Sequence, residues 1–206
     1  YVSENIDKDS DGIISIDETI KTNMIDVANM EIFDLTGIEY FAELKSLDCS
    51  WNWITKLDVS YNTKLENLDC SINFIESLDV SKNTILDVLC CSENMLKSLD
   101  ISNNKVLKKL HCHSNNLTSL DIFNCSDIKT VSAEKNTYEI NFIDSRFDLS
   151  TLPGSFNMEK ASKWTNARSD GTILKLLNPI ENITYEYDCG NGFKQSFTII
   201  PASNSI

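Results

Sequence analysis

The sequence is poor in positive charge. Lysine and arginine number 18 against 31 aspartates and glutamates, which gives a net charge of −13 at pH 7. Proteins that bind nucleic acids neutralise phosphates with basic side chains, and anionic lipid surfaces attract side chains of the same kind. No basic stripe runs along this chain. The composition therefore argues against nucleic acids and anionic membranes as partners.

Long apolar runs and zinc-type cysteine pairs are also missing. No stretch of 18 or more apolar residues is present, so the sequence predicts no membrane-spanning helix. No basic and then apolar segment opens the chain, as expected of a mature or trimmed protein. The chain has seven cysteines but no Cys-x-x-Cys pair, which argues against structural zinc of the usual kind.

What the sequence has instead is a strict period of 21 residues. Leucine or another aliphatic residue lies five and eight positions before each of a series of asparagines. The asparagines are Asn52, Asn73, Asn94, Asn115, Asn136 and Asn157. The position three before them holds Cys49, Cys70, Cys91 and Cys112, and then Ala133 and Gly154. Such a period predicts a solenoid, because one unit cannot bury its apolar face without neighbours.

Each unit reads L-x-x-L-x-C-x-x-N, which is the signature of a leucine-rich repeat. Alternation in period two places Leu47 and Cys49 inward and Asp48 outward. Successive strands are expected to form a parallel sheet on the concave face, about 4.8 Å apart. Each asparagine would be buried, where its amide satisfies backbone groups at the turn. The predicted fold is an α/β-type leucine-rich-repeat solenoid of about five coils with few helices.

The second half of the unit carries an aspartate between two apolar residues. These aspartates are Asp58, Asp79, Asp100 and Asp121. Like charges one coil apart repel unless each accepts backbone hydrogen bonds or points into water. We favour this structural explanation over a cation site. Asn62, Asn83 and Asn104 suit the turn that follows.

Four of the seven cysteines occupy the core column. In a secreted protein seven cysteines would normally suggest disulfides. In the core column, however, cysteine acts as a small buried hydrophobe, and parallel side chains in register give poor disulfide torsions. We therefore expect reduced thiols.

The 21-residue unit with cysteine in its third strand position closely resembles the cysteine-ladder repeats of bacterial internalins. The tail Asp58-Val59-Ser60-Tyr61-Asn62 also resembles that group. The resemblance covers roughly residues 32–157. It implies a secreted or cell-surface bacterial binding protein, without indicating which ligand is bound.

Residues 7–18 match the twelve-residue calcium loop of an EF-hand at every position. The expected ligands are Asp7, Asp9, Asp11, Ile13, Ser15 and Glu18. The aspartates would supply carboxylate oxygens, Ile13 its backbone carbonyl, and Glu18 both oxygens of its carboxylate, while Ser15 would bind directly or through water. The alternative is an acidic solvent-exposed loop, which this spacing disfavours. We predict one bound Ca²⁺ that acts as a structural clip.

The two ends of the solenoid need caps. A helix from Asp17 to about Ala28 is expected after the loop, its acidic start favoured by the helix dipole. Residues 1–43 would then form the N-terminal cap, residues 44–157 the repeats and residues 158–206 a β-rich C-terminal cap. The same loop occurs in dockerins, but a dockerin needs two such loops and one is present here.

A β-hairpin is expected within the C-terminal cap. Residues 183–187 alternate like a strand, Gly190-Asn191-Gly192 is a turn signal, and residues 193–200 would be the partner strand.

Two histidines lie in outward positions of one strand. His111 and His113 are two residues apart, with Cys90 and Glu134 on neighbouring coils. Such a cluster could hold a transition metal. We favour the alternative of two surface histidines on an acidic face.

Large apolar residues flank the first asparagines. They are Trp51, Trp53, Ile72, Phe74 and Met95. Because these positions fall outside the core periodicity, they should face outward at the edge of the sheet. Exposed aromatic clusters mark interaction sites, and such platforms suit sugar rings or peptide side chains. The alternative is packing against the N-terminal cap or a neighbouring molecule.

The sequence therefore favours a monomeric, secreted or cell-surface recognition module that binds a protein or glycan without catalysis. One alternative is a structural spacer that displays another domain. A less favoured alternative is a metal-dependent enzyme that uses His111 and His113, but the strict repeat offers no sheltered cavity for one.

Overall fold

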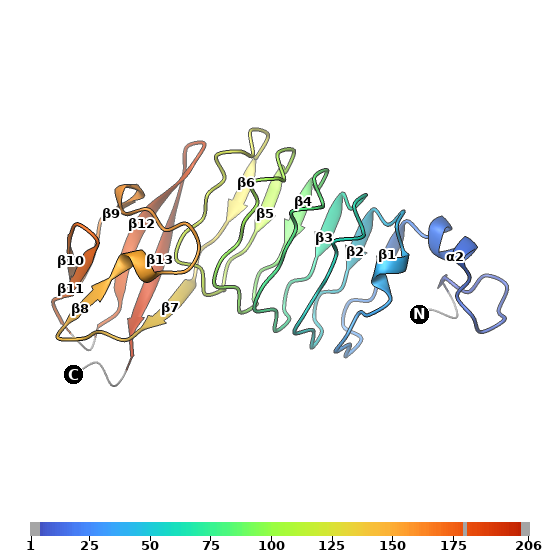
Figure 1. The fold of residues 1–206 in the computed structure, drawn as a ribbon, viewed down its shortest axis with the longest axis horizontal. Helices are drawn as coiled ribbons and strands as arrows, with labels where there is room; N and C mark the ends of the chain where they lie inside the picture. The colour runs from blue at the N-terminus through green and yellow to red at the C-terminus, as the bar shows by residue number, and fades with distance from the viewer. Residues whose placement is uncertain (1–4, 179–180, 203–206) are drawn as a thin grey trace.

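Six short strands follow one another along the chain and pair in parallel, as the period predicts. The computed structural model describes residues 5–178 and 181–202, and Figure 1 shows the coils stacked one after another between the two termini. The strands are β1 (Met24–Asp26), β2 (Ser46–Asp48), β3 (Asn67–Asp69), β4 (Val88–Cys90), β5 (Lys109–His111) and β6 (Thr130–Ser132). They form one sheet in the order β1 to β6. The predicted leucine-rich-repeat solenoid is confirmed.

The strands are in register, so each repeat position forms a column. Leu47 pairs with Leu68, and Leu68 pairs with Leu89. These leucines are buried, and Asp48 and Asp69 on the outward side are partly exposed. The core cysteines of the first four coils are also buried, and all seven cysteines are free thiols. The alternation and the reduced state follow the prediction.

The column of buried asparagines forms the first asparagine ladder, which comprises Asn52, Asn73, Asn94, Asn115 and Asn136. In Asn94, the Nδ2 group donates to the carbonyl oxygens of Cys70, Cys91 and Ser92 at 3.0, 3.2 and 3.3 Å. Its Oδ1 accepts from the backbone N–H of Ile75 at 2.9 Å. Each asparagine therefore joins its own coil to the preceding one through both ends of the amide.

The sixth asparagine of the period is not part of this ladder. Asn157 is exposed and caps the short helix η3 (Met158–Lys160), where its side chain accepts from the N–H of Glu159 at 2.9 Å. The ladder ends at Asn136 because the following strand, β7 (Asn136–Ile140), leaves the repeat sheet and pairs with a C-terminal strand.

A second asparagine ladder runs through Asn62, Asn83 and Asn104, which the sequence suggested only as turn residues. The Nδ2 group of Asn83 donates to the carbonyl oxygens of Val59 and Asn62 at 3.0 and 2.9 Å. The Oδ1 atoms of all three are buried and have no hydrogen-bond partner among the described residues. This ladder therefore uses only the donor end of the amide.

A cysteine occupies the fourth position of the second ladder. The Sγ atom of Cys125 lies 3.8 Å from the carbonyl oxygen of Ile101 and 3.5 Å from that of Asn104. These two oxygens correspond to the ones that Asn104 binds one coil earlier. A thiol suffices at this position because only a donor is needed, although it is a weak one.

The C-terminal part of the chain forms two small sheets. One has the order β7-β13-β12-β9 and the other β10-β11-β8. The strands after β7 are β8 (Arg146–Asp148), β9 (Ala161–Ser162), β10 (Ala167–Asp170), β11 (Ile173–Leu176), β12 (Ile183–Gly190) and β13 (Phe193–Pro201). Strands β12 and β13 pair antiparallel, as the predicted hairpin requires. Short helices η2 (Leu149–Thr151) and η3 lie between these strands.

The tip of this hairpin completes the second ladder. The Nδ2 group of Asn191 donates to the carbonyl oxygens of Ile122 and Cys125 at 2.7 and 3.0 Å. These are the oxygens that the asparagine of a further coil would bind. Gly190 allows this approach, because a Cβ there would lie 3.3 Å from the backbone of Phe123 and its φ is +96°. The cap thus supplies the missing donor from outside the repeat.

The predicted N-terminal helix is shorter than expected. Helix α2 spans Ile16–Lys21 and begins with a capping box between Ser15 and Glu18. The expectation of a helix to about Ala28 is wrong, because β1 begins at Met24 and pairs with β2. Pairing satisfies the backbone groups along the edge of the repeat sheet, which a helix would leave open. No helix in the described ranges is long and apolar enough to cross a membrane.

Candidate functional site

The turn after each strand holds a residue in the left-handed conformation. These residues are Trp51, Ile72, Glu93, Ser114 and Lys135, with φ between 54° and 59°. Such a conformation costs about 1–3 kcal/mol outside glycine, and it is least favourable for a branched side chain such as Ile72. The neighbouring asparagine of the first ladder, bonded at both ends, holds the turn. In the first two coils the sequence places large apolar side chains at these unfavourable positions.

Three aromatic rings lie side by side on successive turns. The ring centroids of Phe33 and Trp53 are 6.2 Å apart, and those of Trp53 and Phe74 are 5.7 Å apart. The ring planes are nearly parallel, at 18° and 15°. The three side chains remain 69%, 49% and 44% exposed. We call Phe33, Trp53 and Phe74 the aromatic row; Met95, also exposed, occupies the equivalent position of the next coil.

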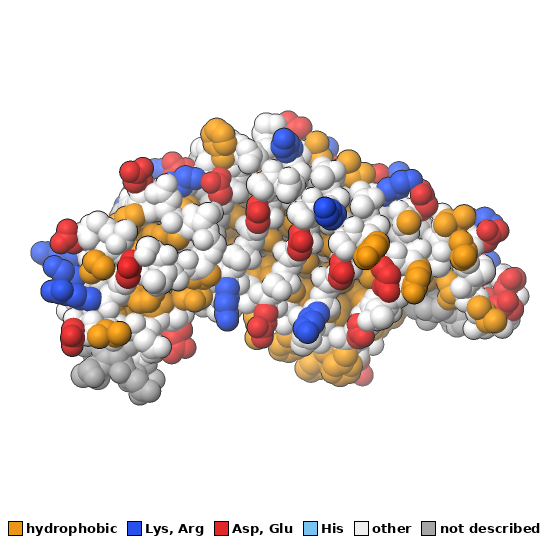
Figure 2. Space-filling view, in the orientation of Figure 1, with side chains coloured by type: hydrophobic (Ala, Val, Ile, Leu, Met, Phe, Trp, Pro, Cys, Tyr) orange, Lys and Arg blue, Asp and Glu red, His pale blue; other side chains and the backbone are white. Residues whose placement is uncertain are grey.

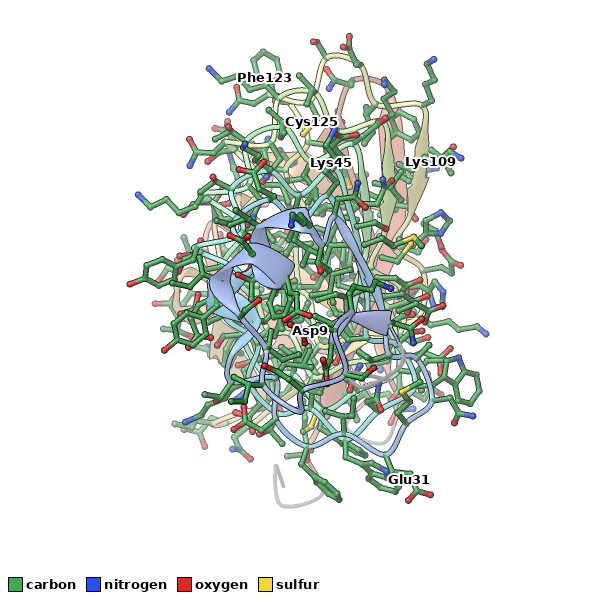
Figure 3. All side chains as sticks on the ribbon, turned by 90° about the vertical axis from the view of Figure 1, so that its right-hand side faces the viewer. Asp9, Glu31, Lys45, Lys109, Phe123 and Cys125 are labelled. Carbon is green, nitrogen blue, oxygen red and sulfur yellow. The ribbon has the colours of Figure 1, made fainter. Side chains whose placement is uncertain are left out.

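The aromatic row lies on one edge of the solenoid. Figure 2 shows hydrophobic side chains gathered at the lower margin of the repeats. In the end-on view of Figure 3, Glu31, which is close in sequence to Phe33, marks this lower edge, and Phe123 lies at the opposite edge. Trp51 is 62% exposed and Ile72 is partly exposed. The predicted outward orientation of all five flanking residues agrees with the structure.

Phe33 is absent from the sequence-based candidates. The N-terminal segment does not keep the period of 21, since the backbone N–H of Trp53 bonds the carbonyl of Ile32, whereas that of Phe74 bonds Ile54, 22 residues after Ile32. In that register Phe33 corresponds to Thr55 rather than to an aromatic residue. No signal in the sequence places Phe33 beside Trp53.

The outward face of the repeat sheet is acidic beside the first coils. Asp26 pairs with Asp48, and Asp48 pairs with Asp69, on neighbouring strands. The Oδ1 atoms of Asp48 and Asp69 accept from the backbone N–H groups of Ser50 and Ser71, both at 3.0 Å. No salt bridge within the described ranges involves Asp48 or Asp69. We call Asp48 and Asp69 the acidic strip.

Cys90 and His111 continue the same column beyond the acidic strip. Burial and then the carboxylates of Asp69 and Asp48 raise the pKa of Cys90 to about 11, so the thiol is protonated at neutral pH. His113 Nδ1 lies 3.2 Å from the hydroxyl of Ser114. The histidines, Cys90 and Glu134 are not among the groups of three or more potential metal ligands that lie close together in the described chain.

The predicted calcium loop brings its three aspartates together. Their carboxylate oxygens, one from each of Asp7, Asp9 and Asp11, lie within 4.8 Å of one another. The Oδ2 atom of Asp7 accepts from the N–H of Gly12 at 3.0 Å, and Gly12 has a φ of +81°. Asp7 is buried, and so is Glu18. The loop therefore directs carboxylates into a shared space rather than outward.

Glu18 holds the two ends of this loop together. Its Oε1 accepts from the N–H of Lys8 at 2.6 Å, and its Oε2 accepts from the N–H and hydroxyl of Ser15 at 2.9 and 2.8 Å. The N–H and hydroxyl of Ser15, followed by the N–H of Lys8, hold the pKa of Glu18 below its usual range.

Crowding of negative charge has the opposite effect on Asp9. The N–H of Asp11 lowers the pKa of Asp9, but desolvation and the carboxylates of Asp11, Glu18 and Asp7 outweigh it and hold the pKa above its usual range. An all-oxygen, negatively charged set of this kind fits a hard divalent cation such as Ca²⁺.

The second column of aspartates is accounted for by hydrogen bonds. Asp58, Asp79 and Asp100 accept from the backbone N–H groups of Ser60, Ser81 and Ser102 at 2.8–2.9 Å. Asp121 accepts from the N–H of Phe123 and from the ammonium group of Lys160. The expectation that these aspartates have a structural role agrees with this geometry.

Comparison with solved structures identifies the fold. Internalin C2 of Listeria monocytogenes superposes with a TM-score of 0.51 over 54% of this chain and 51% of its own, at 22% identity. Internalin F of the same organism gives a TM-score of 0.51 over 68% of this chain and 48% of its own, at 21% identity. The chain has the internalin fold. It spans about half the length of these two proteins.

A third structure with the internalin fold is the functional domain of internalin J from Listeria monocytogenes, described as including a cysteine ladder. It aligns with 91% of this chain and 69% of its own, at 17% identity and a TM-score of 0.47. No protein-family model matches the sequence, and no curated protein sequence matches it.

Proposed function

We propose that this protein is a bacterial recognition module, secreted or held at the cell surface, that binds a protein or glycan and performs no catalysis. The observation that carries the proposal is the aromatic row. Three large rings stay exposed on one edge of a rigid solenoid, although burying them would stabilise the chain. Their support by left-handed turns shows that the sequence maintains this surface against a local energetic cost.

The chemistry of the sheet face supports binding rather than catalysis. Cys90 is the one cysteine that is partly exposed, and a thiol with a pKa of about 11 is a poor nucleophile at neutral pH. The sheet presents its columns on an open surface, whereas general acid–base or metal chemistry requires a sheltered pocket.

A binding screen against glycan and protein arrays tests the proposal, with the wild type beside the Trp51→Ala/Trp53→Ala double variant. We expect a ligand whose binding is lost in the variant. Phe123→Ala is the matched control, because Phe123 is 72% exposed on the opposite edge. Binding that survives in the double variant would move the site to the His111/His113 part of the sheet, and the absence of any ligand would contradict the proposal.

We also propose that residues 7–18 bind one Ca²⁺ and that this ion clips the N-terminal cap onto the first coil. The carboxylates of Asp7, Asp9 and Asp11, the carbonyl of Ile13, and the side chains of Ser15 and Glu18 would hold it. When bound, the cation would neutralise the repulsion among the loop carboxylates. Glu18 begins helix α2, so a loop fixed in this way also fixes the start of that helix.

Thermal unfolding in calcium and in chelator tests the clip. A ligand bound only to the folded state stabilises it by about 2.7 kcal/mol when its concentration is a hundred times Kd. We expect a lower melting temperature in chelator, and an equally low one for Glu18→Gln in calcium. Glu31→Gln, an exposed glutamate outside the loop, should respond to calcium like the wild type. An unchanged melt of the wild type in chelator would refute the clip.

A further inference from the structure

The way the aromatic rings lie restricts what they can bind. The planes of Trp53 and its two neighbours are nearly parallel and face one another, with centroids 5.7–6.2 Å apart. The faces of Trp53 are therefore directed at Phe33 and Phe74, and its free surface is the ring edge. A sugar ring needs an open aromatic face on which to stack. Ring edges and the thioether of Met95 instead form a ridged apolar surface that suits alkyl and aromatic side chains.

The length of this surface matches a short stretch of polypeptide. From Phe33 to Phe74 the two centroid separations are 6.2 and 5.7 Å, and Met95 extends the row by one more coil. An extended chain advances about 3.3 Å per residue. A few residues of an extended segment therefore cover the row, and its alternate side chains would point toward it.

The charge beside the row selects the polar side chains of such a segment. The carboxylates of the acidic strip accept hydrogen bonds from serine groups of their own strands, and no described salt bridge neutralises them. Trp51 lies between Asp48 and Trp53 in the chain and is largely exposed. A guanidinium or ammonium group at this corner could pair with a carboxylate and lie over the indole. Anionic sugars and acidic peptides would be repelled.

We propose that the aromatic row and the acidic strip together bind an extended polypeptide segment in which apolar side chains alternate with lysine or arginine. The inference rests on the proposed recognition function and commits it to one class of partner, a protein rather than a glycan. The apolar side chains lie across the ring edges of Phe33, Trp53 and Phe74. The cationic side chains reach Asp48 and Asp69 past Trp51.

Fluorescence anisotropy with defined probes tests this inference. The probes are a short labelled peptide that alternates lysine with leucine, a glutamate–leucine peptide of the same length, and neutral and sialylated oligosaccharides. We expect the lysine–leucine peptide to bind the wild type and the glutamate–leucine peptide not to bind. Trp53→Ala/Phe74→Ala and Asp48→Asn/Asp69→Asn should each weaken binding at least about tenfold. Phe123→Ala should bind like the wild type.

Each other outcome has a defined meaning. Loss in the aspartate variant but not in the aromatic variant would indicate attraction by charge alone and would overturn the inference. Failure of the lysine–leucine peptide to bind would overturn it as well. If a neutral oligosaccharide binds and Trp53→Ala/Phe74→Ala abolishes this, the inference fails while the recognition function stands. Self-association that depends on Trp53, measured by sedimentation, would identify a second copy as the occupant and overturn the inference.

Circular dichroism shows whether the variants are folded. All four substituted residues are exposed or partly exposed, and asparagine can still accept the N–H bonds of Ser50 and Ser71. We therefore expect native spectra.

Discussion

The two asparagine ladders should respond differently to the same substitution. Asn94 and Asn83 are both buried, and replacement of either by cysteine removes an amide and leaves a thiol. The chain itself carries this replacement at Cys125, in the second ladder. We predict that Asn83→Cys is tolerated and that Asn94→Cys is severely destabilising.

The magnitude follows from the hydrogen bonds of each amide. Asn83→Cys loses two donations, which a thiol partly replaces, and removes an Oδ1 that has no partner. We expect a loss of about 1–2 kcal/mol from the free energy of unfolding. Asn94→Cys loses three donations and also the acceptor for the N–H of Ile75. A buried donor without a partner costs about 1–3 kcal/mol, so the total is about 3–5 kcal/mol.

Urea unfolding in reducing buffer measures both variants, followed by circular dichroism and by tryptophan fluorescence. Agreement between the two probes shows whether the array unfolds as one unit. Asn116→Ala is a control outside both ladders, since Asn116 is half-buried and its side chain donates one bond, to the carbonyl of Thr137 at 3.0 Å. Equal losses for Asn83→Cys and Asn94→Cys, or a larger loss for Asn83→Cys, would refute the distinction between the ladders.

Three further predictions follow. Asn191→Gly keeps the left-handed backbone but removes the donor to Ile122 and Cys125, so chemical denaturation should show a loss of about 1–3 kcal/mol; an unchanged midpoint would show that the hairpin tip does not stabilise the array. The hydroxyl and N–H of Ser60 hold the pKa of Asp58 below its usual range, so its contribution is present above about pH 4 and lost as pH falls through the lowered value. Melting curves against pH should show this loss, and Asp58→Asn should weaken it; identical pH profiles would contradict the assignment. A thiol reagent should modify about one cysteine in the native protein, Cys90, faster at alkaline pH, and none in Cys90→Ser; rapid modification of several thiols would mean that the core column is open.

The repeats could be predicted from the sequence because their order is periodic. One coil fixes the next, so the columns of leucine, cysteine and asparagine specify the parallel sheet, its register and the outward residues such as Trp53. The acidic loop could be predicted in the same way, because its ligand spacing is local. The proximity of Asp7, Asp9 and Asp11 depends on a few turns of backbone and on nothing distant in the chain.

The features that were missed depend on contacts between segments that share no period. Phe33 joins the aromatic row because the N-terminal segment enters the stack one residue out of the period. Strand β1 replaces the end of the expected helix because the sheet edge needs a partner, which no local pattern reveals. Asn191 lies 66 residues from Cys125 in the chain, so its role in the second ladder could be seen only in three dimensions.

The bonds of Asn191 separate the number of coils from the way the array ends. The hairpin tip binds the last coil as a further coil would bind it, so the cap fits any array whose final coil presents the same two carbonyl oxygens. Whole units of 21 residues could be added or removed near the middle of the repeats without change at this junction. The reach of the molecule, and the number of side chains displayed along its edges, can therefore vary by gene duplication and deletion while both ends stay the same.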